Sequence, residues 1–298
     1  DRMLEAQPAS ADLLYTAGAL ALEQEGFARA TNYLERVRET GERVDEATLL
    51  LGQVAETADD GEAALDWYLQ VEGESAQKAR IRAAFVQIRH GRLEAAHALM
   101  DRLRAQSPEQ AAELYLVEAE ILQQHDQDAQ AMTIYDQAIS IWPEDLDLLY
   151  GRAMLAIGMD RVDLLERDLR QILMRDPDHV SALNALGYTL ADRTDRLDEA
   201  LRLIQRAHEL SPETPAILDS LGWVLYRRGD PAAAEPYLRQ ALEAGFDAEI
   251  AAHLGKVLWA LGQHEQAEAV WDDALKAAPE HEYLNRLLGE HRFSNSKP

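Results

Sequence analysis

Small residues, glycine or alanine, return along this chain about every 34 positions, and the apolar and polar residues around them return in the same order. We mark this position at Gly18, Gly52, Ala84, Ala119, Ala153, Gly187, Gly222 and Gly255, with gaps of 34, 32, 35, 34, 34, 35 and 33 residues. Twelve or thirteen positions after a mark, a second small residue follows: Ala30, Ala64, Ala96, Ala131, Ala200, Ala234 and Ala267. In the fifth repeat, Leu165 takes this place. A bulky apolar residue follows four positions later: Leu34, Tyr68, Met100, Tyr135, Leu169, Ile204, Leu238 and Trp271. A fixed period of this length is typical of stacked helix pairs.

Each period predicts two antiparallel helices joined by a short turn. Helix axes approach to about 8–10 Å only where the facing side chains are small, so the two small positions are expected at the contact between the helices. The bulky residue lies on the same face of the second helix as the small residue four positions before it, and we expect it to fill the gap against the next repeat. Proline recurs about ten residues before a mark and is expected to end each second helix: Pro8, Pro108, Pro143, Pro177 and Pro212, with Pro279 after the last repeat.

The period predicts an all-α fold, a right-handed α-solenoid of about eight helix-turn-helix repeats with a C-terminal capping helix. Residues 1–10 are interpreted as the end of a truncated preceding repeat, 11–280 as the eight repeats, 281–291 as the capping helix and 292–298 as a disordered tail. No Gly/Ser/Pro-rich linker interrupts the period, which favours a single array. The alternative, an ordinary alanine-rich helical domain, does not explain one phase kept along the whole chain.

This pattern resembles the tetratricopeptide repeat family over about residues 1–280. The resemblance is strongest in Leu221–Tyr226 followed by Ala234, Leu238 and Ala241. It is nearly as strong in Leu254–Leu258 followed by Ala267, Trp271, Ala274 and Pro279. The resemblance implies a solenoid whose first helices line an inner, concave face that binds other polypeptides.

Charge and composition exclude several classes of function. The 54 acidic and 29 basic residues give a net charge of −25, which argues against binding duplex DNA, RNA or an anionic membrane surface. The chain has no cysteine, so disulfides, cysteine nucleophiles and thiolate metal sites are excluded. No phosphate-binding glycine loop and no paired-histidine zinc motif occurs, and no apolar run is long enough to span a membrane. His125 and His179 lie beside acids, but at turns, where such residues are common. We therefore predict a protein that is not an enzyme and has no cofactor or metal.

Residues three before, one after and four after each mark are expected to face the inner surface. In the C-terminal repeats, these positions and their neighbours predict an aromatic strip edged by amide, acid and base: Asn184, Tyr188, Asp219, Trp223, Tyr226, Arg227, Lys256 and Trp259. Aromatic side chains give large contact areas at a low cost in entropy, and the basic groups suit a carboxylate. Alternatively, Trp223 and Trp259 are packing residues between neighbouring first helices. The sequence leaves both interpretations open.

The predicted function is a non-catalytic scaffold or adaptor for a protein or peptide. The C-terminal repeats and the arginine-rich, cysteine-free composition also resemble repeat lipoproteins of Gram-negative envelopes. That resemblance implies a periplasmic protein, anchored in the outer membrane through a lipid on a missing N-terminal segment. It further implies an adaptor that binds a carboxyl-terminal processing protease and presents its substrates. The alternatives are a cytoplasmic protein, the repeat region of an enzyme such as a glycosyltransferase, or an assembly factor for pili, outer-membrane proteins or exported polysaccharide.

Overall fold

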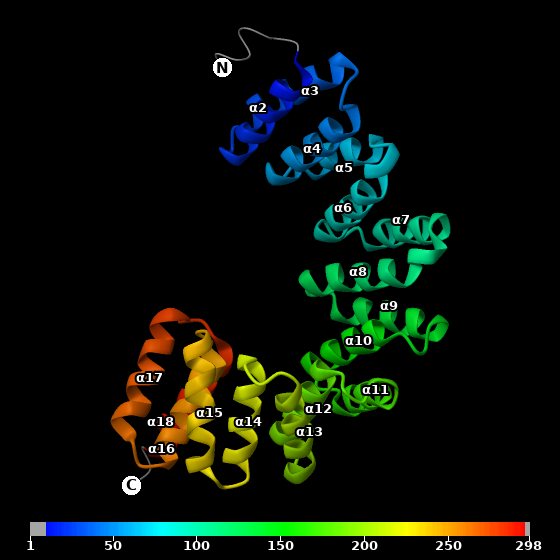
Figure 1. Cartoon of the computed structure of the whole chain (residues 1–298). Coiled ribbons are helices and arrows are strands. Elements are labelled where there is room, and N and C mark those ends of the chain that lie inside the picture. Colours follow the sequence, from blue (N-terminus) through cyan, green and yellow to red (C-terminus); the bar gives the residue numbers. More distant parts are fainter. Residues whose placement is uncertain (1–9, 296–298) are drawn as a thin grey trace. The chain divides into compact units, whose positions relative to one another are not determined.

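The computed structural model describes residues 10–295, which form seventeen α-helices, two 3₁₀ turns and no strand. The helices follow one another as eight pairs and a final single helix (Figure 1). The first four pairs are α2 (Ala11–Glu23) with α3 (Phe27–Thr40), α4 (Val44–Thr57) with α5 (Gly61–Gln70), α6 (Ala76–Arg89) with α7 (Leu93–Gln106), and α8 (Ala111–Gln124) with α9 (Asp128–Ile141). The last four are α10 (Leu146–Gly158) with α11 (Val162–Arg175), α12 (Val180–Arg193) with α13 (Leu197–Leu210), α14 (Pro215–Arg227) with α15 (Pro231–Ala244), and α16 (Ala248–Ala260) with α17 (His264–Ala277). The all-α repeat architecture predicted from the sequence is confirmed.

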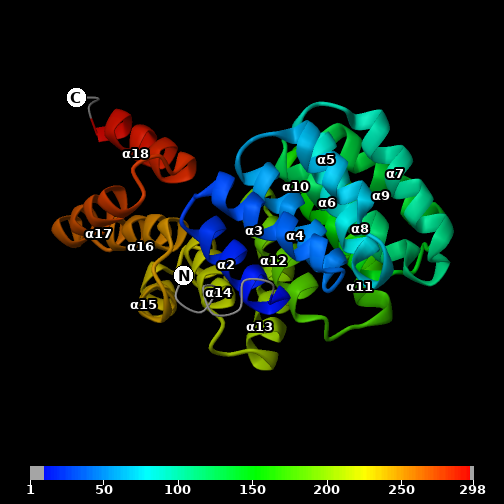
Figure 2. The same cartoon turned by 90° about the horizontal axis from the view of Figure 1, so that it is seen from above.

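The chain divides after Pro143 into two compact units, although the sequence favoured a single array. The first unit holds the pairs from α2 to α9, and the second holds the pairs from α10 to α17 together with α18 (Glu282–Asn295). Helix α18 packs on α16 and α17 at the end of the second unit (Figure 2).

The ends of the chain differ in part from the prediction. Helix α18 continues to Asn295, four residues beyond the predicted end at 291, so residues 292–295 are helical and not a disordered tail. Residues 296–298 lie outside the described residues. So do residues 1–9, nearly all of the segment interpreted as the end of a preceding repeat.

In the five repeats whose marked position is glycine, that glycine touches the bulky residue of its own second helix. A methyl group added at Gly18 would lie 2.8 Å from Leu34, and one added at Gly52 would overlap the ring of Tyr68. The same holds for the glycines facing Ile204, Leu238 and Trp271. The bulky residue is also buried in a cluster with residues of the next repeat, as for Leu34 with Leu50 of α4 and Leu238 with Leu254 of α16. It closes the contact within its own pair, because glycine lets the two backbones approach closely.

The turn inside each pair uses one left-handed residue, seven positions after the mark. It is glycine in three repeats and an acidic residue in four: Gly91, Gly229 and Gly262, and Glu25, Asp59, Asp126 and Asp160, all with positive φ. The sixth repeat departs from this rule. Its turn is one residue longer, and Thr194 is extended, with φ of −141°. Its Oγ1 accepts from the backbone N–H of Arg196, 3.1 Å away.

Arginine–carboxylate pairs link successive repeats within each unit. An arginine pairs with an acid of the preceding repeat about 30 positions earlier, as in Arg43–Asp12, Arg92–Glu62, Arg196–Glu166 and Arg228–Asp198. Many of the 54 acids are therefore partnered on the surface, where each pair contributes little to stability.

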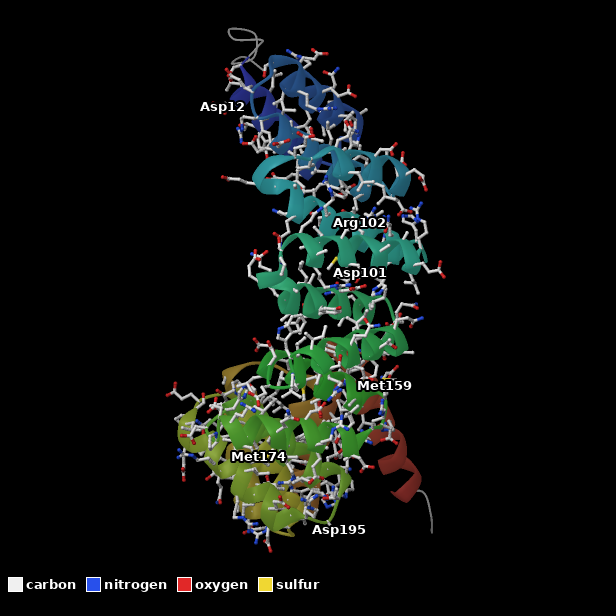
Figure 3. The ribbon with its side chains drawn as sticks, turned by 90° about the vertical axis from the view of Figure 1, so that its right-hand side faces the viewer. Asp12, Asp101, Arg102, Met159, Met174 and Asp195 are labelled. Atoms are coloured by element: carbon white, nitrogen blue, oxygen red, sulfur yellow. The ribbon has the colours of Figure 1, made fainter. Side chains whose placement is uncertain are left out.

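Among the large apolar side chains of the described residues, Met174 near the end of α11 has the highest exposed fraction, 77%. It is labelled in Figure 3. None of the described helices is long and apolar enough to cross a membrane.

Candidate polypeptide-binding site

Three first helices of the second unit, α12, α14 and α16, carry the predicted aromatic strip, and α18 completes it. Trp223 lies at its centre. Its indole ring stacks on the imidazole of His253, with centroids 4.1 Å apart and planes 19° apart, and on Tyr226 at 5.4 Å. Lys256 places its Nζ 5.6 Å from the Trp223 ring centroid, within the range of a cation–π interaction.

A fully buried histidine ties α14, α16 and α18 together. His253 is 0% exposed. Its Nδ1 lies 2.9 and 3.1 Å from the two carboxylate oxygens of Asp219, and its Nε2 lies 2.9 Å from the hydroxyl of Tyr283. An ionised carboxylate only accepts, so Nδ1–H of His253 donates to Asp219, while Nε2 shares a hydrogen bond with the hydroxyl of Tyr283. The network fixes the last helix against the strip.

Helix α12 joins the cluster through Tyr188, whose hydroxyl donates to Oε1 of Glu249 on α16. Burial, and then the negative charge of Glu249, raises the pKa of Tyr188 far above its usual value. Burial, followed by Asp192 and Glu249, likewise raises the pKa of Tyr283. Both phenols are therefore neutral hydrogen-bonding groups at physiological pH.

Two hollows of opposite character lie along these helices. The first, of about 500 Å³, has acceptor groups from Asn184, Asp219, Asp247 and Glu249 in its wall, beside the half-exposed Phe246. The second, of about 610 Å³, is lined by donors from Arg193, Arg227, Lys256 and Arg286, with the rings of Trp223, Tyr226 and Tyr283 and with Asp192. Asp219 and Trp223 are one turn apart on α14, and Tyr188 and Asp192 are one turn apart on α12. The hollows therefore adjoin along one face.

Several polar groups of the cluster are fixed by the protein, and two have no protein partner. Nη1 of Arg227 donates to the backbone oxygen of Asp192 at 2.9 Å. By contrast, the buried indole N–H of Trp223 and the buried amide oxygen of Asn184 find no hydrogen-bond partner within residues 10–295. A buried donor or acceptor without a partner costs free energy.

The structure brings seven of the eight predicted residues to this face and separates the eighth. Asn184, Tyr188 and Asp219 line the acidic hollow, and Trp223, Tyr226, Arg227 and Lys256 line the basic one. Trp223 and Asp219 are buried, 3% and 6% exposed, so they form the floor of the site and not its accessible surface.

Trp259 does not belong to the strip, which corrects the prediction for this residue. Its ring contacts His264 at 3.9 Å and Trp271 at 6.1 Å, both on α17. Four residues after the mark, the side chain thus packs against its own second helix.

Sequence reasoning missed His253, Glu249, Tyr283 and Arg286. The separation of 34 residues between Asp219 and His253, one repeat period, was a signal that could have paired them. Tyr283 and Arg286 lie on α18, the helix predicted from the sequence as a cap.

The aspartate–histidine pair of this cluster is enclosed by the protein. An aspartate–histidine pair often activates a nucleophile. Here the imidazole is closed off between Trp223, Asp219 and Tyr283, and no substrate reaches it. No group of three or more His, Cys, Asp or Glu side chains in the described part of the chain is arranged to hold a metal ion.

Two family models described as tetratricopeptide repeat match the chain. One covers residues 178–244, and the other covers 15–79, 220–281 and 253–297. The chain belongs to the tetratricopeptide repeat (TPR) family. Members of this family generally mediate protein–protein interactions through their stacked repeats.

Relatives of this TPR chain are mostly longer proteins. A TPR repeat-containing protein of Pseudomonas aeruginosa is 48% identical over 214 residues, covering 72% of this chain and 36% of its own length. The cellulose synthase 2 operon protein C of Komagataeibacter xylinus is 26% identical, covering 61% of this chain and 14% of its own length. The chain thus spans about a third or less of these two relatives. A TPR protein structure from Parabacteroides merdae has a TM-score of 0.59 at 17% identity, covering 82% of this chain and 97% of its own, which shows the shared fold alone.

Proposed function

We propose that this TPR chain is a non-catalytic scaffold that binds an extended polypeptide along α12, α14, α16 and α18. The observation that carries the proposal is the pair of adjoining hollows, one lined by acceptors and the other by donors. An extended peptide presents backbone N–H and C=O groups together with charged side chains, and it can satisfy both hollows at once.

The two hollows also suggest the polarity of the ligand. Basic side chains or backbone N–H groups suit the side of Asp219, Asp247 and Glu249. Acidic side chains, backbone carbonyls or a chain-terminal carboxylate suit the side of Arg227, Lys256 and Arg286. Tyr226, half-buried between the donors, supplies the apolar contact.

The test compares a double variant in the basic hollow with a lysine-to-glutamate change outside the site. Lys256→Glu combined with Tyr226→Ala alters the basic hollow, and Lys276→Glu alters a lysine on α17 whose side chain is 74% exposed. The immobilised chain is incubated with a lysate of its native bacterium, and the captured proteins are identified by mass spectrometry. Partners held by the wild type and by Lys276→Glu, but lost by the double variant, support the proposal. The same partners on all three proteins, with all three equally stable, would refute it.

We further propose that the intact protein is an outer-membrane-anchored lipoprotein facing the periplasm. In this proposal it binds a carboxyl-terminal processing protease and presents substrates to it. The support is the resemblance of the C-terminal repeats to envelope repeat lipoproteins. The first check is the sequence of the gene, in which we expect a signal peptide followed by a lipid-attachment cysteine upstream of this segment. The second is co-purification of such a protease with the intact protein, and its absence from a capture that retains other partners would contradict the protease assignment.

A role in polysaccharide export is the second candidate, because a relative is named for a cellulose synthase operon. Deletion of the gene distinguishes the two proposals. Loss of an exported polysaccharide with normal turnover of protease substrates favours export, and the reverse favours the protease adaptor.

A further inference from the structure

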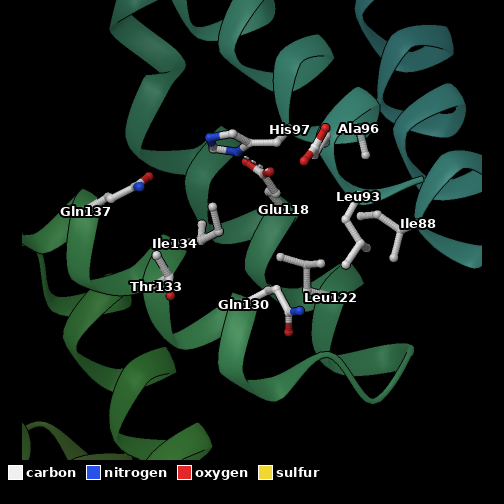
Figure 4. Close-up of a pocket in the computed structure, with 11 residues that line it drawn as sticks. Ile88, Leu93, Ala96, His97, Glu118, Leu122, Gln130, Thr133, Ile134 and Gln137 are labelled. Atoms are coloured by element: carbon white, nitrogen blue, oxygen red, sulfur yellow. Dashed lines mark hydrogen bonds and ion pairs between the residues drawn. The ribbon is translucent and has the colours of Figure 1, made fainter. Parts of the chain in front are cut away.

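The first unit contains a cavity of about 240 Å³ that the proposed polypeptide site does not use. It lies between the second helices α7 and α9, with side chains of α8 as its floor (Figure 4). Its wall is mainly apolar, formed by Ile88, Leu93, Ala96, Leu122 and Ile134. A dry apolar cavity of about 150 Å³ suffices for benzene, so this one has room for a six-membered ring with a short side chain.

One end of the cavity is polar and carries excess negative charge. The carboxylate of Glu118, 2% exposed, accepts from Nδ1 of His97 at 2.9 Å and from Nη1 of Arg104 at 2.5 Å. Arg104 also donates to Asp101 at 2.7 Å, and Glu94 lies in the cavity wall. Figure 4 shows the His97 ring and the Glu118 carboxylate facing each other, away from Leu93 and Ile88. Three carboxylates, those of Glu94, Asp101 and Glu118, thus lie near one guanidinium and one imidazole, so this end of the cavity is complementary to a cation.

The register of the repeats shows that a smaller side chain stands at this cavity than in the first two repeats. Ile134 lies fifteen residues after its mark, where the first and second repeats have Tyr33 and Trp67. Those two rings pack against the core of the N-terminal repeats. An isoleucine is smaller than either ring, so the fourth repeat leaves space where an aromatic side chain stands in the first two.

We propose that this cavity is a binding site for a small amphiphilic cation, an aromatic or branched apolar group that carries an ammonium. The apolar group lies between Leu93, Leu122 and Ile134, and the ammonium lies at Glu94 and the His97–Glu118 pair. Apolar pockets with a few convergent polar groups are the usual form of small-molecule sites. This site is independent of the polypeptide site in the other unit.

The test is calorimetric titration of the whole chain with phenethylammonium. Ethylammonium, which lacks the ring, and 2-phenylethanol, which lacks the charge, serve as comparison ligands. We expect saturable binding of phenethylammonium, binding of 2-phenylethanol weaker by about two- to fivefold, and no binding of ethylammonium. No saturable binding of phenethylammonium, or equal binding of all three, overturns the proposal.

Variants then place the ligand in the cavity. Ile134→Trp introduces the residue found at the same register in the second repeat, and it should lower affinity at least tenfold while the protein keeps its helical circular dichroism. Glu94→Gln should weaken binding by about two- to fivefold, the range for one exposed ion pair. Glu113→Gln, the same change at an exposed position of α8, should leave binding unchanged. If Ile134→Trp fails to fold, the contrast between Glu94→Gln and Glu113→Gln still decides. Unchanged binding in Glu94→Gln, or in a folded Ile134→Trp, refutes the site.

Discussion

At the scale of single residues, the close contact inside each helix pair depends on glycine in five of the eight repeats. Gly52→Ala places a methyl group into the ring of Tyr68, which is fully buried and donates to Glu56 at 2.6 Å, so the ring cannot easily move. We expect a loss of about 1–3 kcal/mol in the free energy of unfolding, the range for overpacked cores. Urea denaturation followed by circular dichroism measures it.

The control is Gly158→Ala at the last residue of α10, where an added methyl group meets nothing within 4 Å. It should be neutral or stabilise by up to about 1 kcal/mol through helix propensity. Equal destabilisation by both alanines would mean that the Tyr68 contact does not govern the packing of this pair.

Substitutions of Trp223 and Tyr226 distinguish a role in packing from a role in ligand binding. Trp223→Ala removes a side chain that is 3% exposed and should cost about 3–5 kcal/mol of stability. Tyr226→Ala, at a half-buried position, should cost less and should reduce ligand binding more. Thermal unfolding and partner capture on the two variants check this, and a stable Trp223→Ala protein would show that the residue is not part of the core.

At the scale of elements, the turn inside every pair but the sixth holds a residue in the left-handed region. Asp126 adopts φ of +58° between α8 and α9, a conformation that glycine reaches without a steric penalty. Asp126→Gly should therefore stabilise the first unit by about 0.5–1 kcal/mol, offset in part by the greater entropy of the unfolded chain. Asp128→Gly, at the first residue of α9, should instead destabilise, because it removes the acidic group from the first turn of the helix. A gain in the melting temperature for the first variant and a loss for the second is the expected outcome.

Helices α11 and α13 are joined by a network of Glu166, Arg170, Arg196 and Glu199. The hydrogen bond from Arg170 lowers the pKa of Glu199, against the effect of burial, and Arg196 lowers it further. A carboxyl whose pKa is lower in the folded state stabilises the fold above its unfolded pKa of about 4.3, and that contribution is lost as the pH falls through the folded value. Because both arginines are about 40% exposed, the contribution is at most about 1 kcal/mol.

Glu199→Gln should accordingly destabilise the second unit by about 0.5–1 kcal/mol at pH 7 and by nothing measurable at pH 3. Urea unfolding at both pH values tests this, with Glu265→Gln, an exposed position of α17, as the control. A difference that persists at pH 3 would show that Glu199 acts through packing and not through its charge.

The helices were predictable because small and apolar residues recur at fixed positions in every repeat. Which helices contact each other was only partly predictable. The period identified both helices of every repeat. It did not show that Leu34 contacts the glycine of its own pair as well as the next repeat, since both contacts are made from the same face of the second helix. The Arg196–Glu166 bridge was predictable in principle, from a separation close to one repeat.

The site was predictable only where position within the repeat decides the direction of a side chain. That rule placed Tyr188, Trp223 and Lys256 on one face but failed for Trp259, whose ring packs on its own second helix. It also missed His253, which lies one residue off the counted register. Its burial follows from two contacts, with Asp219 and Tyr283, that only the three-dimensional structure brings together.

At the scale of the whole molecule, stability at high pH depends on phenols that the fold keeps neutral. Burial raises the pKa of Tyr68, Tyr188 and Tyr283 above the usual range, and burial followed by the nearby charge of Glu120 raises that of Tyr135 to about 12. In the unfolded chain these groups ionise near pH 10. A group whose pKa is higher in the folded state gives stability that is complete below the unfolded value and is lost as the pH rises toward the folded value.

The free energy of unfolding should therefore be constant up to about pH 9.5 and then fall by as much as about 1.4 kcal/mol per pH unit for each such tyrosine. Tyr135→Phe should make this decline shallower, because it removes one of the titrating groups, whereas Tyr15→Phe, at a half-exposed position, is the control. Urea unfolding between pH 8 and pH 11 gives the slope, and absorbance at the phenolate band shows when the rings ionise. Ionisation of every tyrosine near pH 10 without unfolding would contradict the burial of these four rings. Unfolding that coincides with the late part of the phenolate titration would show that the packed interior of the repeats keeps them neutral.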